Sequence, residues 1–281
     1  MMGASNPFGI LIAILAAFVW GSGDFVGGRS TRGRHPYQVL ALVSITGVVL
    51  LVLAAWLRGE TWAGPAVLLW GSVAGVSGGF GLAMLYRGLA TTEAAVVAPT
   101  AAVVGVVLPV LIGAALIGLP TPLQVMGLVA GTMGIWLVAR GASATARADS
   151  GLGLGLLAGI GFGGFFVSMA QVPGGSVFTP LIVSKSVATL LGVIVVLQQR
   201  QPLLTPRDNP WAVLAGLLDA AGNVFYLIAA HMTRLDFAAL VSSMAPAVTV
   251  VLAGAISRQR VAPRQWVGVG LCMAGIVMIA A

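Results

Sequence analysis

Long apolar stretches alternate with short polar connections along the whole chain. A helix needs about 20 mainly apolar residues to cross the hydrocarbon core of a bilayer, and the stretches have that length. Polar and apolar residues do not alternate within them, as they would in the strands of a membrane β-barrel. The pattern therefore predicts ten transmembrane helices, at 8–27, 37–57, 66–86, 94–117, 122–139, 151–170, 177–198, 211–230, 237–256 and 263–281.

The composition agrees with this pattern. Of 281 residues, 59% are hydrophobic and 7% are charged, and the mean hydropathy is +1.05. A soluble domain carries roughly 25% charged residues, so the sequence predicts an all-α integral membrane protein. The net charge of +7 does not indicate a nucleic-acid partner, because the basic residues lie between apolar runs. Cys272, His35 and His231 lie far apart in sequence, so we expect no disulfide, metal site or cofactor.

The two halves of the chain repeat each other. PLQVMGLVAGTMGIWLVA (122–139) aligns with PRQWVGVGLCMAGIVMIA (263–280), and the same offset of 141 residues aligns AGVSGGFG (74–81) with AGLLDAAG (215–222). We therefore expect two repeats, 1–141 and 142–281, with five spans each. Because five is odd, the second repeat must enter the membrane in the opposite orientation. Inverted repeats are typical of secondary transporters that work by alternating access.

Arginines predict the orientation. The connections after the odd-numbered spans hold eleven arginines, whereas the other connections hold only Arg58 and Arg234. By the positive-inside rule, the arginine-rich connections are cytoplasmic and both termini lie outside. The eleven are Arg29, Arg32, Arg34, Arg87, Arg140, Arg147, Arg200, Arg207, Arg258, Arg260 and Arg264.

Three segments carry a family resemblance: 18–25 (FVWGSGDF), 85–90 (LYRGLA) leading to Val97-Ala98-Pro99, and 240–252 (LVSSMAPAVTVVL). Together they resemble the EamA-like family of the drug/metabolite transporter superfamily. The resemblance implies a proton-coupled or facilitative carrier of metabolites, amino acids or drugs, more often an exporter. It also implies ten helices in two repeats. Many members place a Gly-Glu pair after the fourth and ninth spans and have cytoplasmic termini; this chain lacks the pair, and its arginines indicate the opposite orientation.

Three formally charged residues fall inside the predicted spans: Asp24, Lys185 and Asp219. A charge at a helix centre costs roughly 2.5–3.5 kcal/mol, so each needs a partner or a wet cavity. Lys185 and Asp219 lie near the middle of adjacent spans, and Asn223 follows Asp219 by one turn. The offset aligns these charges with uncharged residues: Asp24 with Phe165, Lys185 with Ser44 and Asp219 with Gly78.

These residues form the predicted substrate- or ion-binding site. We expect Lys185 to hold an anionic group of the substrate and Asp219 to bind a cationic group or a proton. The alternative is a Lys185–Asp219 ion pair with a structural role alone. Trp20 and Tyr226 are candidates for an aromatic cavity wall, and Asp24 either contributes to the site or pairs with Arg29 at the interface.

The sequence thus predicts a secondary transporter, not an enzyme, in the cell inner (plasma) membrane. We expect it to move an amino acid, a similar zwitterionic or amphipathic solute, or a drug, with efflux as the direction. A non-transporting scaffold or receptor and a membrane-embedded enzyme are the alternatives. No nucleophile or metal motif such as H-E-x-x-H supports the enzyme. The partners are the substrate and the bilayer. A monomer suffices, and Gly127-x-x-x-Gly131 leaves a homodimer as an alternative.

Overall fold

A computed structural model describes residues 6–30, 34, 36–61, 64–91, 94–139, 151–256 and 261–280. These residues form helices and connections, with no strand among them. The predicted boundary between the repeats, at residues 141 and 142, lies outside the described residues. The helices are α1 (Pro7–Ser30), α2 (Pro36–Arg58), α3 (Pro65–Thr91), α4 (Ala94–Ile117), α5 (Pro122–Ala139), α6 (Leu152–Ala170), α7 (Phe178–Gln198), α8 (Pro210–Met232), α9 (Leu235–Ser242), α10 (Ala245–Ala255) and α11 (Pro263–Ala280).

The helices coincide with the predicted spans to within a few residues. Eight segments of the described chain are long and apolar enough to cross a membrane, with Leu235–Leu252 counted as one, and two shorter apolar helices lie at Thr100–Leu116 and Pro122–Val138. Large apolar side chains are exposed on their outer faces, among them Leu111 and Val277. Such a surface is stable in lipid and not in water. The prediction of an all-helical protein with ten apolar segments is confirmed.

Proline begins many of these helices. It is the first residue of α1, α2, α3, α5, α8 and α11, a position where a helix needs no backbone N–H from that residue. The starts of α5 and α11 also share a cap: Gln124 Oε1 accepts from Thr121 N at 3.1 Å, and Gln265 Oε1 accepts from Ala262 N at 3.0 Å. The duplicated sequence thus repeats its helix starts as well as its apolar pattern.

The ninth span is interrupted. The sequence predicts one helix over 237–256, whereas the structure has α9 and α10, separated by Ser243 and Met244. Pro246 has no N–H to donate to the carbonyl of Ser242, so the regular ladder cannot continue through this point. Ser243 N donates to Ala239 O, four residues back, at 3.0 Å. Met244 N donates to Val241 O, only three residues back, at 3.1 Å. Ser243 and Met244 lie midway along the apolar segment Leu235–Leu252.

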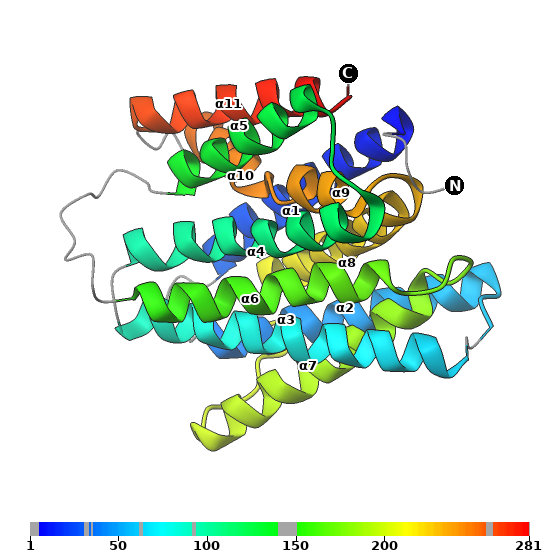
Figure 1. Ribbon diagram of the computed structural model, residues 1–281. Helices are drawn as coiled ribbons and strands as arrows, with labels where there is room; N and C mark the ends of the chain where they lie inside the picture. Colours follow the sequence, from blue (N-terminus) through cyan, green and yellow to red (C-terminus); the bar gives the residue numbers. More distant parts are fainter. Residues whose placement is uncertain are drawn as a thin grey trace.

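The helices alternate in direction, so their connections gather at two ends (Figure 1). We call the end where α1 begins and α11 ends the terminal end, and the opposite one the arginine end, because the described Arg29, at the end of α1, and Arg264, at the start of α11, lie there. In Figure 1 the terminal end is at the right. Helix α1 starts at the terminal end and α6 at the arginine end, so the two halves enter the bundle from opposite ends.

Packing follows the duplication. Helix α1 packs on α8 as its counterpart α6 packs on α3, and α2 packs on α8 as α7 packs on α3. Helix α4 packs on α6 as α9 and α10 pack on α1. Two further contacts, α5 with α11 and α2 with α7, each join equivalent helices of the two halves. The arrangement is that of two similar units related by an approximate two-fold axis.

Candidate functional site

A cavity of about 750 Å³ lies between the two halves. It is lined by residues of α1, α2, α3, α4, α6, α7 and α8 and by the interruption between α9 and α10. At the arginine end its lining reaches Gly28, Val39 and Leu85, close to the ends of their helices. On α1 and α8 the lining stops at Trp20 and Asn223, 13 and 9 residues from the terminal end of each helix, whereas on α6 and α7 it reaches Phe166 and Leu181, four and three residues from that end. A volume of this size accommodates a small metabolite.

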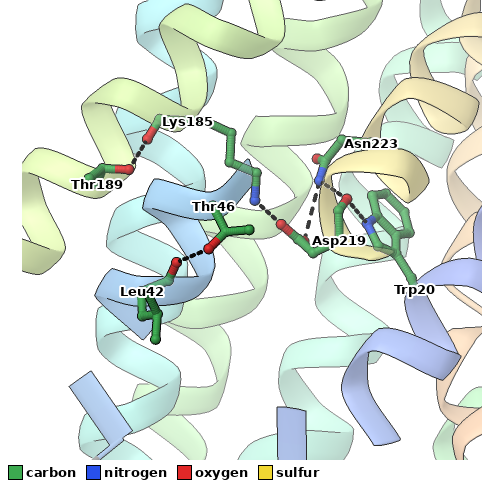
Figure 2. Close-up of polar contacts among 7 residues, drawn as sticks. All are labelled: Trp20, Leu42, Thr46, Lys185, Thr189, Asp219 and Asn223. Atoms are coloured by element: carbon green, nitrogen blue, oxygen red, sulfur yellow. Dashed lines mark hydrogen bonds and ion pairs between the residues drawn. The ribbon is translucent and has the colours of Figure 1, made fainter. Parts of the chain in front are cut away.

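Lys185 and Asp219 form an ion pair in the cavity wall (Figure 2). Lys185 Nζ, from α7, donates to Asp219 Oδ2, from α8. Helices α7 and α8 both pack against α2 but hardly against each other, so the pair bridges two helices that otherwise have little contact. The side chains are 15% and 33% exposed, respectively. Both charges are therefore accessible from the cavity, as a binding site requires.

Asn223 orients Asp219. It lies one turn further along α8, and its Nδ2 donates to Asp219 O at 2.6 Å and to Asp219 Oδ1 at 3.3 Å (Figure 2). Asn223 also lines the cavity and is almost fully buried. The carboxylate of Asp219 thus has one oxygen on Lys185 and the other near an amide donor, which fixes its orientation.

Trp20 borders the ion pair from the first half. Its Nε1 donates to Asp219 O at 3.2 Å, which ties α1 to α8 (Figure 2). The indole lies directly against Gly222, where a Cβ would come within 2.4 Å of Trp20 Cδ1. Only glycine at 222 therefore allows this approach. Trp20 lines the cavity, as predicted for a wall residue.

Tyr226 lies behind this wall. It is fully buried, and its ring stacks on Trp20 with centroids 5.9 Å apart. Its hydroxyl donates to Phe166 O at 2.7 Å. Tyr226 is not among the residues that line the cavity. In this conformation it supports Trp20 and Phe166.

Asp24 stands apart from the ion pair. Its exposed side chain lines the cavity, and it makes no hydrogen bond or ion pair with any residue that the structure describes. Arg29, the partner considered from sequence, instead lies over the Trp211 ring at 5.0 Å from its centroid. Asp24 thus faces the cavity with no partner among the described residues.

The cavity holds residues that sequence reasoning left out of the site. Phe162 and Phe165 extend the aromatic wall, and Ser184, Ser242 and Ser243 add hydroxyl groups. The repeat alignment could have identified Ser44 and Gly78 as further lining residues. Phe165, Ser44 and Gly78, the residues aligned with Asp24, Lys185 and Asp219, all line the same cavity. Equivalent positions of both halves therefore build one site, with charge placed on one member of each pair.

Glu60 connects the halves at the terminal end. Its Oε2 accepts from Val177 N and Phe178 N, both at 3.1 Å, and its Oε1 accepts from Thr179 N at 2.7 Å. Partial burial alone would raise the pKa of this carboxyl, but the backbone N–H donors outweigh it and hold the pKa below 4.5. A loop of the first half thus caps the first turn of α7 in the second half.

A second ion pair lies at the same end and corrects a sequence prediction. Asp236 lies in the first turn of α9, with its side chain fully buried, so the expectation of only three charged residues inside the spans is wrong. Arg234 Nη2 donates to Asp236 Oδ2 at 2.9 Å and to Gly118 O at 2.7 Å. Because Arg234 and Asp236 flank the predicted start of the span, their burial could not be seen in the apolar pattern.

Among the described residues, no three histidine, cysteine, aspartate or glutamate side chains gather as metal ligands would. The strongest feature of the site is therefore a helical cavity with an ion pair and aromatic walls. The cavity lies within a bundle of helices, most of them long and apolar enough to cross a membrane.

The chain belongs to the EamA-like transporter family, whose sequence model matches residues 7–140 and again residues 149–281. The resemblance noted in the sequence is thereby confirmed, and the protein is a multi-pass membrane protein of a transporter family. None of the curated proteins matches the chain significantly. One solved structure, titled only "Crystal structure of protein", matches with a TM-score of 0.75 and 22% identity over 98% of this chain and 96% of that chain. That likeness shows the fold.

Proposed function

We propose that this protein is a secondary transporter that moves an amino acid or a similar zwitterionic solute across the inner (plasma) membrane by alternating access. The observation that carries the proposal is the Lys185–Asp219 pair in the wall of a cavity between two similar halves. A zwitterion can replace both partners of such a pair at once. The site thus offers one charge for each end of the substrate.

In the loaded state, Lys185 holds the carboxylate of the substrate and Asp219 holds its ammonium group. Asn223 keeps Asp219 in position, and Trp20 provides an apolar face beside it. Without substrate, Lys185 and Asp219 neutralise each other. A carboxylate that accepts either a cationic group or a proton also gives the carrier a means of proton coupling.

The two ends of the bundle support alternating access. On α1 and α8 the cavity lining lies toward the arginine end, and the terminal end is held by Glu60 on α7 and by the Arg234–Asp236 pair. Because the halves are related by an approximate two-fold axis, exchanging their conformations would open the terminal end and close the other.

The arginine count supports efflux as the direction. If the arginine end is cytoplasmic, both termini lie outside and the cavity is open to the cytoplasm. A carrier in this state loads substrate from the cell, as an exporter does. Ten segments in two halves form a complete carrier, so we propose a monomer in the bilayer.

A ligand screen tests the proposal. The thermal stability of the purified protein in detergent is measured with amino acids, polyamines, organic cations, nucleosides and sugar phosphates, for the wild type and Lys185→Gln. Ligand at about 100 times its Kd adds roughly 2.7 kcal/mol of stability. We expect a zwitterion to stabilise the wild type and to lose its effect in the variant. Ser186→Ala, an exposed change on the same helix, is the control.

A counterflow measurement in proteoliposomes with the zwitterion that stabilises most then separates a carrier from a receptor. Exchange of labelled against unlabelled substrate identifies a carrier. If the zwitterion binds but no exchange occurs in the reconstituted wild type, the protein is a receptor. If stabilisation by zwitterions is equal in Lys185→Gln and wild type, the assignment of Lys185 is wrong.

A further inference from the structure

The cavity carries one negative charge that nothing in the described structure compensates. Three charged side chains line it: Lys185, Asp219 and Asp24. Lys185 and Asp219 neutralise each other, which leaves the carboxylate of Asp24. An unpaired charge in a membrane interior is costly unless a partner or water compensates it. When the cavity closes around Asp24, a cation or a proton has to neutralise its charge.

The helices packed on α1 provide no such cation. On α8, Asp219 is bound to Lys185, and His231 Nε2 contacts Val172 O at 2.9 Å. On α9, Asp236 is bound to Arg234 at the terminal end, and the described part of α10 has no charged or titratable side chain. On α1 itself, Arg29 lies over Trp211. The compensating charge therefore comes from a ligand or from a proton.

The surroundings of Asp24 suit an organic cation. Gly28, one turn after Asp24, also lines the cavity, and nothing lies within 4 Å of where its Cβ would be, which leaves space beside the carboxylate. Trp20 lies one turn earlier on α1, and Phe162 and Phe165 belong to the opposite half of the lining. An ammonium group binds favourably to a carboxylate next to an aromatic face, and an apolar body fits such walls.

We propose that Asp24 forms a second binding site in the cavity, specific for the ammonium group of amphipathic organic amines that carry no carboxylate. The inference rests on the transporter function proposed above. Such an amine has no carboxylate for Lys185 to bind, so the Lys185–Asp219 ion pair stays intact. The same carboxylate binds a proton when the amine is absent. One amine thus exchanges for one proton, and the closed cavity is neutral with either.

Two matched ligands test this. Phenethylamine and L-phenylalanine differ only in the carboxylate, and their binding is measured by calorimetry with the purified protein. We expect Asp24→Asn to weaken phenethylamine binding about tenfold or more, the typical effect of losing a hydrogen bond to a charged group. Lys185→Gln weakens L-phenylalanine and leaves phenethylamine within about threefold of the wild type. Asp208→Asn, the same change at an exposed residue outside the cavity, is the control.

Proton competition provides a second readout. Lowering the pH weakens phenethylamine binding to the wild type, because the proton and the amine share Asp24. Asp24→Glu keeps the charge and restores binding, which separates loss of the site from loss of the fold. The inference is overturned if the wild type does not bind phenethylamine, or if Asp24→Asn binds it as tightly as the wild type. L-Phenylalanine binding and its dependence on Lys185 test the proposed function separately.

Discussion

Gly131 and Cys272 occupy equivalent positions of the two repeats and face each other across the contact between α5 and α11. They are 141 residues apart, and Cys272 Sγ lies 3.9 Å from Gly131 O. On either side of them, Gly127 packs on Gly275 and Gly134 packs on Gly268. Gly127 is equivalent to Gly268, and Gly134 is equivalent to Gly275, so each contact is the counterpart of the other. The approximate two-fold axis therefore passes between Gly131 and Cys272.

This contact predicts which glycines of α11 tolerate a side chain. A Cβ at Gly275 would lie 2.8 Å from Gly127 O and 2.9 Å from Gly131 N, both backbone atoms that cannot move alone. We expect Gly275→Ala to destabilise the protein by about 1–3 kcal/mol, as overpacking does. Gly270→Ala, where nothing lies within 4 Å, should leave stability nearly unchanged. Thermal unfolding in detergent compares the two, and equal midpoints would contradict the close approach of α5 and α11.

Glu60 gives a prediction of pH dependence. Its pKa in the folded protein is lowered, so its contribution to stability is present above the unfolded pKa of about 4.5 and is lost as the pH falls through the folded value. We expect Glu60→Ala to cost about 1 kcal/mol at pH 7, as the loss of a helix cap does. Glu60→Gln keeps the acceptor oxygen and should cost less.

The difference in thermal stability between wild type and Glu60→Gln is then measured from pH 7 to pH 3. It should shrink below pH 4.5, where the unfolded chain takes up a proton, and disappear once the pH has fallen through the lower pKa of the folded protein. A difference that stays constant over this range would show that the charge of Glu60 does not stabilise α7.

The apolar pattern predicts the helices well because lipid forces every span to be long, apolar and helical. It does not predict the interruption at Ser243 and Met244, since proline is also tolerated in continuous membrane helices. It does not reveal that Arg234 and Asp236 are buried, because both come just before the apolar run. Their burial depends on the ion pair that they form with each other. Both features depend on packing between helices.

The candidate site was predictable in part for the same reason. Lys185 and Asp219 are conspicuous because charges are rare in spans, and the structure brings them together. Tyr226 shares the helix face of Asp219 and Asn223, yet it lies outside the lining. Seven residues of helix extend about 10 Å, so a residue on the same face can lie beyond the end of a cavity. Sequence periodicity gives the face of a residue, not its depth.

The packing of Trp20 on Gly222 predicts a coupled pair of substitutions. Gly222→Ala would place a Cβ 2.4 Å from Trp20 Cδ1 and displace the indole from Asp219. We expect a loss of about 1–3 kcal/mol in stability. In a Trp20→Ala background the same change should cost much less, because the clash is gone. Thermal unfolding of the two single variants and the double variant measures this, and additive costs would argue against the contact.

Orientation can be tested with single cysteines, because Cys272 is the sole cysteine of the chain and Cys272→Ala removes it. Leu119→Cys places a thiol in an exposed connection at the terminal end, and Thr205→Cys places one at the arginine end. If the termini lie outside, a membrane-impermeant maleimide added to intact cells labels position 119 and spares position 205 until the cells are lysed. The reverse result would place the arginine end outside and make the cavity outward-facing.

The Lys185–Asp219 pair predicts a difference between stability and binding. Lys185→Met leaves Asp219 without its cation. Breaking a fully buried pair costs about 3–5 kcal/mol, and we expect less here because both side chains are partly exposed to the cavity. Adding Asp219→Leu should restore most of the stability, since two apolar residues leave no uncompensated charge. The double variant should nevertheless bind no zwitterion, because both charges that hold it are gone. Recovery of stability together with binding would show that the pair only connects α7 to α8.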